Sequence, residues 1–172
     1  MILPSIGHFM PPRPIVAFPD PRLKQSAEPV TDFGPKLKAI AADLVETMRD
    51  VPGIGIAGPH IGIGLRVIAI QLASDQPLHV CANPEILSTS GELARHTEGS
   101  ISMRGISEEV ERPARVRVRY QDLDGGVHEM DADGFLGVCF QHEIDQIDGV
   151  FWLQRLSRLK RDRAIKRYGK RG

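Results

Sequence analysis

The sequence predicts an α+β fold in a single domain, on the basis of its length and the order of its helical and strand patterns. A chain of 172 residues is the usual size of one domain. Helical periodicity is confined to segments 35–49 and 134–147 and to the basic end of the chain, while the region between the first two reads as short strands. Strands gathered in the middle and flanked by helices are typical of α+β architecture.

The first helix is expected over residues 35–49, after a proline-rich extended arm (1–14) and a short strand at 15–18. Thr31 or Asp32 is a candidate N-cap, and the Pro-Gly pair that follows the helix ends it. The helix has the three- and four-residue apolar spacing of one buried face; its apolar members are Leu37, Ile40, Ala41, Leu44, Val45 and Met48.

A glycine-rich loop at 53–64 then leads into the strand region. Arg alternates with Val or Tyr over 115–120, and an Asp-Gly-Gly turn precedes residues 127–130, which predicts a hairpin. Its three arginines, Arg115, Arg117 and Arg119, share one face at period two and are expected to be solvated. Further strands are expected over 65–72, 78–82 and 86–88.

The last segment of the chain carries an uneven charge. Residues 155–171 hold nine basic residues and one acidic residue, a charge of +8, so the rest of this neutral chain carries −8. One interpretation is a basic helix that meets a polyanion such as RNA. The other is a solvated amphipathic helix that packs through Leu156, Leu159 and Ile165.

Composition excludes several protein classes. Hydrophobic residues make up 41% of the chain and charged residues 26%, which is ordinary for a soluble domain. The longest aliphatic run, Val67–Ile70, is far below the ~20 residues that cross a bilayer. Prolines interrupt residues 1–14, so no signal peptide is expected. Cys81 and Cys139 form neither a CxxC pair nor a disulfide framework, which favours a cytoplasmic protein. Because the apolar runs are short, no membrane partner is expected.

The helix at 134–147 contains the first chemical motif. His142 and Glu143 begin the pattern H-E-x-x-H, in which two histidines one helical turn apart bind a metal and the glutamate moves protons. Gln146 occupies the second histidine position, and an amide oxygen is a poorer ligand than an imidazole. Alone, this motif fits a helix whose His and Gln simply form hydrogen bonds.

Two other segments give the motif a context. Residues 53–60 read G-I-G-I-A-G-P-H, and residues 98–102 read E-G-S-I-S. In this order, with Q-H-E-I-D-Q at 141–146, they resemble the peptide deformylase patterns G-φ-G-φ-A-A-x-Q, E-G-C-φ-S and Q-H-E-φ-D-H, where φ is aliphatic. The resemblance extends from about residue 14 to residue 163 and includes P-D-P-R-L at 19–23 and N-P-E-I at 83–86.

The resemblance implies a fold, a reaction and a set of roles. The fold would have antiparallel strands around the helix of His142, and the reaction would be metal-dependent hydrolysis of the N-formyl group from the N-terminal methionine of nascent polypeptides. Iron, nickel or zinc would be the metal. Carried onto this chain, the metal positions are Ser100, His142 and Gln146, and Glu143 is the acid/base. His60 and the backbone amide of Ile101 face the oxyanion; Gly53, Gly55 and Ser102 contact substrate.

Three of these positions depart from the family. Ser100 replaces a thiolate, Gln146 replaces an imidazole and His60 replaces a glutamine, so one standard ligand remains. We therefore expect the standard activity to be weak or absent. The resemblance also implies that Glu98 and Arg112 form a buried ion pair with a structural role behind the metal loop. Cys139 is expected to belong to the core.

Several alternatives stay open. His60, His142 and a carboxylate are the donors of a two-His, one-carboxylate iron site. Ser100 is a possible nucleophile, with His142 or His60 as base and Glu143 orienting it. The chain is otherwise a non-catalytic binder of nascent peptide or of the ribosome, since its basic end resembles a helix that docks on the ribosome in some family members. A hydrolase of another small amide is the last alternative.

Overall fold

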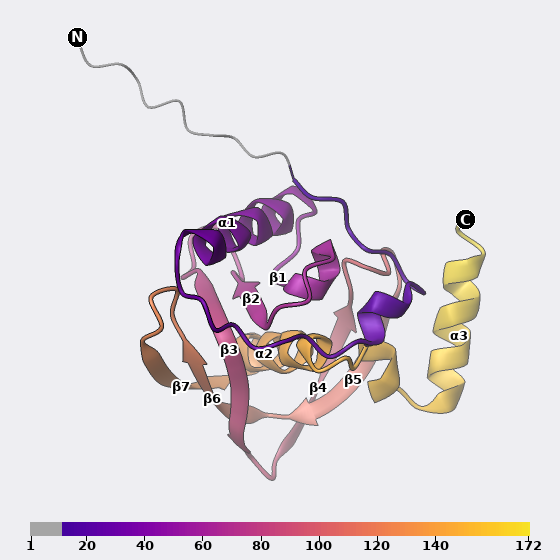
Figure 1. The fold of residues 1–172 in the computed structure, drawn as a ribbon. Helices are drawn as coiled ribbons and strands as arrows, with labels where there is room; N and C mark the ends of the chain where they lie inside the picture. The colour runs from indigo at the N-terminus through magenta and orange to yellow at the C-terminus, as the bar shows by residue number, and fades with distance from the viewer. Residues whose placement is uncertain (1–11) are drawn as a thin grey trace.

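The computed structural model describes residues 12–172, and Figure 1 shows the order of their elements. Within these residues the helices are α1 (Pro35–Asp50), α2 (Gly134–Ile147) and α3 (Arg158–Gly169), with short 3-10 helices η1 (Pro21–Lys24), η2 (Gly58–Ile61) and η3 (Trp152–Arg155). The expected arm at 1–14 lies almost wholly outside the described residues.

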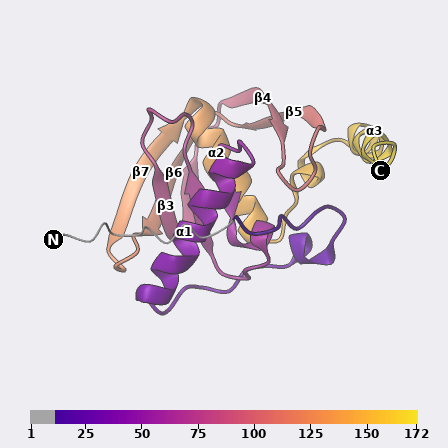
Figure 2. The same cartoon turned by 90° about the horizontal axis from the view of Figure 1, so that it is seen from above.

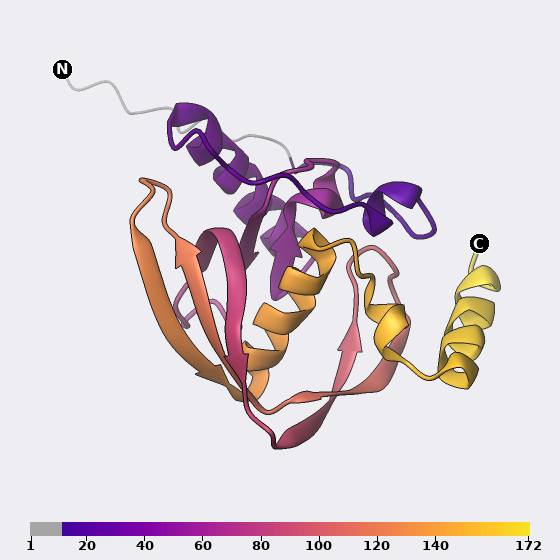
Figure 3. The ribbon, with the colours of Figure 1, turned by 60° about the horizontal axis from the view of Figure 1, so that its bottom comes forward.

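Two antiparallel sheets complete the fold. The five-stranded sheet has the order β1-β2-β3-β6-β7, and β4 and β5 form a separate pair. Helix α2 runs between the two sheets, as Figure 3 shows, so its side chains meet both. The strands are β1 (Gly55–Ala57), β2 (Val67–Ile70), β3 (His79–Thr89), β4 (Leu93–Gly99), β5 (Ser107–Pro113), β6 (Arg115–Gln121) and β7 (Val127–Asp133).

Helix α2 is central because most of its surface is apolar. Phe140, Ile144 and Ile147 pack with residues of β2 and β6 such as Ile68 and Val118 in one core cluster. Four polar residues of the helix are nevertheless buried: Gln141, Glu143, Asp145 and Gln146. Burying a polar group is unfavourable unless it is hydrogen-bonded or serves a ligand, so these four residues direct attention to the site.

Most of the predicted elements are confirmed. The helices at 35–49 and 134–147 and the hairpin of β6 and β7 appear at nearly the predicted bounds. The arginines of β6 are solvated and ion-paired, for example Arg117 with Glu129 and Asp131. The strands at 78–82 and 86–88 are one strand, β3, whose pairing register shifts next to Asn83, a residue with φ of 48°.

Other expectations are wrong. Residues 15–18 form no strand, because only single hydrogen bonds join them to the fold, from Val16 N to His60 O and from Phe18 N to Ser102 O. The N-cap of α1 is Gly34, which makes no side-chain cap, and not Thr31 or Asp32. Strands β4 and β5 were not foreseen.

The basic end of the chain forms α3, which begins at Arg158 and not at residue 155. Ser157 caps it by accepting a hydrogen bond from Lys160 N. Leu156 and Ala164 are buried, but Leu159 is 60% and Ile165 40% exposed, so the expected packing through those two residues is wrong. Seen from above, α3 lies at the opposite end of the molecule from β7 (Figure 2). No helix among the described residues is long and apolar enough to span a membrane.

Candidate functional site

The three motif segments meet at one cavity of about 270 Å³. Its walls come from residues 52–55 with His60, from residues 97–101, and from the face of α2 that carries Val138, Cys139, His142 and Glu143. A larger hollow of about 590 Å³ lies along β3, β6 and β7, but no motif segment lines it. The site is therefore built where the end of β4 and the start of β1 approach the middle of α2.

Glu143 lies on the floor of this cavity and is 4% exposed. Its Oε2 has no hydrogen-bond partner among the described residues. Its carboxyl packs beside Gly55, where an added Cβ would stand 2.6 Å from Glu143 Oε1, so a larger residue at position 55 would force the carboxyl or the strand to move. Burial raises the pKa of Glu143 to about 7, because desolvation disfavours the charged carboxylate.

His60 faces the same cavity from η2 and is a neutral hydrogen-bond donor. Its Nδ1 accepts a hydrogen bond from the backbone N–H of Ala57 at 2.9 Å, which leaves the ring proton on Nε2. That Nε2 is buried and has no partner in the described structure. Burial lowers the pKa of His60 to about 3. The 3.8 Å approach of Nδ1 to Glu143 Oε2 is thus a contact and not an ion pair.

His142, on α2, is oriented by Glu98, which lies on β4. Its Nδ1 lies 3.0 Å from Glu98 Oε1, and Arg112 donates to the same carboxylate at 2.7 and 2.9 Å. Burial is the largest effect on His142 and opposes its charged form, but the bond to Glu98 together with the negative charges of Glu143 and Glu98 outweighs it and raises the pKa. Burial likewise opposes the Glu98 carboxylate, yet His142 and Arg112 bring its pKa to about 2. The predicted ion pair of Glu98 and Arg112 is confirmed.

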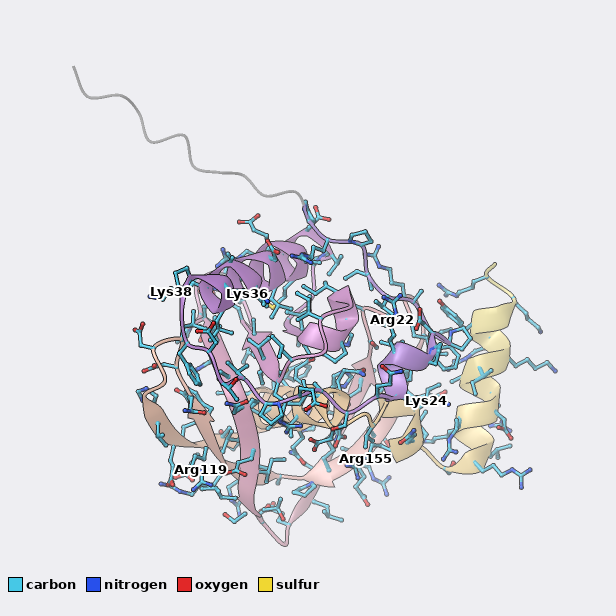
Figure 4. The ribbon with its side chains drawn as sticks, in the orientation of Figure 1. Arg22, Lys24, Lys36, Lys38, Arg119 and Arg155 are labelled. Carbon is cyan, nitrogen blue, oxygen red and sulfur yellow. The ribbon has the colours of Figure 1, made fainter. Side chains whose placement is uncertain are left out.

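This network continues to two residues that the sequence analysis missed. Arg112 Nη1 donates to Asp145 at 2.8 Å, and Arg155, labelled in Figure 4, donates to both oxygens of Asp145 at 2.9 and 2.6 Å. A chain of ion pairs thus runs from the partly exposed Arg155 to His142. The signal for Asp145 was its place inside the motif at 141–146; no signal marked Arg155.

Gln146 does not line the cavity, although it stands one turn after His142. Its Nε2 donates to the carbonyl oxygen of Leu23 at 2.8 Å, and the residue is 2% exposed. Ser100 does line the cavity, and its Oγ accepts a hydrogen bond from Ser102 N at 3.1 Å. The side chain at 146 is therefore held by the N-terminal segment of the chain.

These residues do not fit a divalent metal. They offer one imidazole, from His142, a neutral hydroxyl and an amide whose nitrogen end is bound to Leu23, which is a poor donor set for a first-row metal. Over residues 12–172, no three His, Cys, Asp or Glu side chains form a group that could hold a metal. The two-His, one-carboxylate alternative is therefore wrong. The nucleophile alternative also lacks its geometry with either base: Glu98, and not Glu143, orients His142, and the Nδ1 of His60 accepts from Ala57 N and lies 3.8 Å from Glu143 Oε2, beyond hydrogen-bond distance.

The remaining predicted contacts divide into two groups. Gly53, Gly55 and Ile101 line the cavity, and a Cβ at Gly53 would stand 3.0 Å from Ile101 Cγ2. Ser102 lies outside, on a neighbouring groove, with its Oγ buried and unpartnered in the described structure. Cys139 is 6% exposed at the edge of the cavity, and burial raises its pKa to about 12, which agrees with a core thiol.

Comparison with known proteins gives consistent matches. A family model described as polypeptide deformylase matches residues 12–162. A Brucella melitensis protein named peptide deformylase-like is 56% identical over 158 residues, which is 92% of this chain and 96% of that protein. A Legionella pneumophila peptide deformylase structure superposes with a TM-score of 0.88 at 36% identity, covering 93% and 95% of the chains. A Synechococcus elongatus peptide deformylase, solved in complex with actinonin, superposes with a TM-score of 0.88 at 34% sequence identity. The match covers 94% of this chain and 90% of that chain.

Proposed function

The chain belongs to the polypeptide deformylase family, and from that membership we propose that it binds the N-terminal segment of a polypeptide without hydrolysing an N-formyl group. The observation that carries the proposal is the 2.8 Å hydrogen bond from Gln146 Nε2 to the Leu23 carbonyl. Position 146 holds a metal ligand in the family pattern, and here its side chain makes a structural hydrogen bond instead. Ser100 supplies no thiolate. The family's metal-dependent step therefore lacks its donors, while the cavity around it is kept.

Two free strand edges support an extended peptide in the cavity. Within the described structure β1 pairs only with β2, and β4 pairs only with β5. Residues of both strands, Gly55 of β1 and 97–99 of β4, line the cavity. An extended peptide laid between two such edges forms main-chain hydrogen bonds as an added strand, which gives affinity with little dependence on sequence.

The cavity floor supports recognition of an amide at the end of that peptide. The Nε2–H of His60 and the Oε2 of Glu143 have no partner in the described structure, and they are the donor and the acceptor that a carbonyl oxygen and an amide N–H require. The N–H of Ile101 has no acceptor among the described residues and supplies a second donor. Phe135 and Val138 give the apolar wall that a methionine side chain requires. An N-formylmethionyl peptide satisfies each of these groups.

A binding and turnover experiment tests this proposal. The protein, offered iron, nickel or zinc under anaerobic conditions, is titrated into a fluorescent formyl-Met peptide, and the peptide is then weighed by mass spectrometry. We expect saturable binding with the formyl group intact. His60→Ala should weaken binding, whereas His128→Ala, on the distant strand β7, should not. Metal-dependent loss of the formyl group, or absence of binding, would contradict the proposal.

A second candidate function is docking of α3 on ribosomal RNA, as proposed from its charge. Arg163 and Lys166 make no ion pair with any residue from 12 to 172, and the helix stands at one end of the molecule (Figure 1). A variant that carries both Arg163→Glu and Lys166→Glu should co-sediment less with ribosomes than the natural protein. Its binding should also depend less steeply on salt concentration. Lys36→Glu on α1 is the control. Equal co-sedimentation of all three proteins would exclude this function.

A further inference from the structure

A groove of about 460 Å³ adjoins the peptide cavity at the loop that follows α1. Its lining includes Asp50 and Val51, which come directly before the cavity residues Pro52 and Gly53. Ile101 lines both the cavity and the groove. The two hollows therefore share a wall, so that a peptide chain leaving the cavity past Ile101 enters the groove.

Another wall of the groove is the segment of residues 12–17, which leads toward η1. Figure 1 shows this segment between α1 and α3, and contacts hold it to both helices. Arg13 N donates to Thr47 Oγ1 of α1 at 3.1 Å. Phe18 packs edge-on against Tyr168 of α3, with ring centroids 5.8 Å apart. Tyr168 itself lines the groove, so α3 forms part of the wall.

The segment presents an unpaired main-chain edge to the groove. The N–H groups of Val16 and Phe18 point into the fold, where each donates to a backbone carbonyl at 2.8 Å. Successive residues of an extended chain point to opposite sides, and Ile15 and Ala17, but not Val16, line the groove. Among residues 12–172, the N–H groups of both and the C=O of Ile15 have no partner. An extended peptide can pair with these groups as an added strand pairs with a sheet edge.

The rim of the groove carries an excess of positive charge. Arg104 lines the groove and makes no ion pair within the described part of the chain. The guanidinium of Arg171 packs on Gly105, the next residue, and adds a second positive charge there. Arg13 is neutralised by its ion pair with α1, and Asp50 is the acidic residue of the lining. Two guanidinium groups against one carboxylate favour a peptide segment with an acidic side chain.

We propose that this groove binds the part of a polypeptide that continues beyond the residues held in the cavity, and that it favours an acidic side chain there. The inference rests on the proposed function, because the same peptide must occupy the cavity. Ser102, which follows Ile101, lines the groove with a buried Oγ that has no partner in the described structure. A buried hydroxyl of this kind is satisfied when a ligand supplies its hydrogen bond.

Peptide length and charge provide the test. Fluorescence anisotropy measures the affinity of the full-length protein for three labelled formyl-Met peptides: a tripeptide, an octapeptide with glutamates in its second half, and the same octapeptide with lysines in their place. We expect the glutamate octapeptide to bind roughly tenfold more tightly than the tripeptide, as for two added main-chain hydrogen bonds. The lysine octapeptide should bind with intermediate affinity.

Two variants assign the gain to the groove. Ile15→Pro removes one N–H of the unpaired edge and leaves that of Val16 in place, so it should weaken octapeptide binding several-fold and leave tripeptide binding unchanged. Arg104→Glu should reverse the preference between the two octapeptides. Lys36→Glu, at an exposed position near the start of α1, changes the net charge equally and should leave that preference unchanged.

The outcomes separate this inference from the proposed function. Tripeptide binding with no gain for either octapeptide overturns the groove and leaves the proposed function standing. A gain that neither Ile15→Pro nor Arg104→Glu alters also overturns it, because the added contacts then lie elsewhere. If Ile15→Pro loses the tripeptide as well, Arg104→Glu decides, since it changes only an exposed side chain. Absence of binding by all three peptides overturns both proposals.

Discussion

The carboxyl of Glu143 lies directly on the backbone of Gly55, so closely that a Cβ at position 55 would stand 2.6 Å from Oε1 and 3.2 Å from Cδ. Gly55→Ala must therefore displace either the carboxyl or strand β1. We expect the free energy of unfolding to fall by about 1–3 kcal/mol, the usual cost of overpacking, and formyl-peptide binding to be lost. Gly64→Ala is the control, because nothing lies within 4 Å of its added Cβ. Unchanged binding by Gly55→Ala would show that Glu143 does not contact the ligand.

Arg112 is the centre of the buried ion-pair chain, so its removal should be costly. Arg112→Met leaves the buried Glu98 carboxylate with His142 alone and the Asp145 carboxylate with the partly exposed Arg155 alone. We expect a loss of about 3–5 kcal/mol, as for other buried pairs that lose one member. Arg117→Met removes exposed ion pairs with Glu129 and Asp131 and should change stability by less than about 1 kcal/mol. Urea unfolding followed by the fluorescence of the single, buried tryptophan measures both; equal effects would contradict the burial argument.

The bond between Gln146 and Leu23 joins α2 to the N-terminal segment, and its loss leaves a buried carbonyl unpaired. We expect Gln146→Leu to lower the free energy of unfolding by about 1–3 kcal/mol. Gln146→His should retain most of that stability, because Nδ1–H replaces the amide donor. Gln154→Leu, at an exposed position of η3, is the matched control. Thermal melting of the three variants decides the point, and a Leu variant as stable as the natural protein would remove the structural role of Gln146.

The elements that the sequence predicted are those whose signal is local. Helix α1 follows from the spacing of its apolar residues, and the β6–β7 hairpin from its Asp-Gly-Gly turn. Strands β4 and β5 lacked such a signal, because most of their side chains are polar or charged and only Glu98, Val110 and Arg112 are buried. Their pairing with one another, and not an apolar face, gives them strand structure.

The site, like the fold, has a part that the sequence predicted and a part that it could not. Motif order located the segments of His60, Ser100 and His142, and the structure brings all three to one cavity. The partner of Gln146 was out of reach of the sequence, because Leu23 is 123 residues away and offers a backbone oxygen, which any residue type supplies. Pairings of this kind depend on the tertiary fold alone, and here one of them decides between a metal ligand and a structural contact.

The raised pKa of Glu143 predicts a pH dependence of stability with a definite sign. The folded-state pKa of about 7 lies above the ordinary value of 4.5, so the folded protein binds this proton more tightly than the unfolded chain does. The stabilisation is complete below pH 4.5 and is lost as the pH rises from 4.5 to 7. At roughly 1.4 kcal/mol per pKa unit, the loss is about 3 kcal/mol.

Glu143→Gln isolates this effect, because glutamine does not titrate and has nearly the same shape. Relative to the natural protein, the variant should gain stability steadily between pH 4.5 and 7 and hold the gain above pH 7. The lowered pKa of His60 acts in the opposite direction, since stability is lost as the pH falls from 6.5 to 3, but both proteins share that contribution and it cancels in the difference. Urea unfolding of both proteins at pH 5 and pH 8 measures the change. Parallel stability curves would mean that the Glu143 carboxyl is ionised in the folded protein, and that it meets the ligand as an acceptor only.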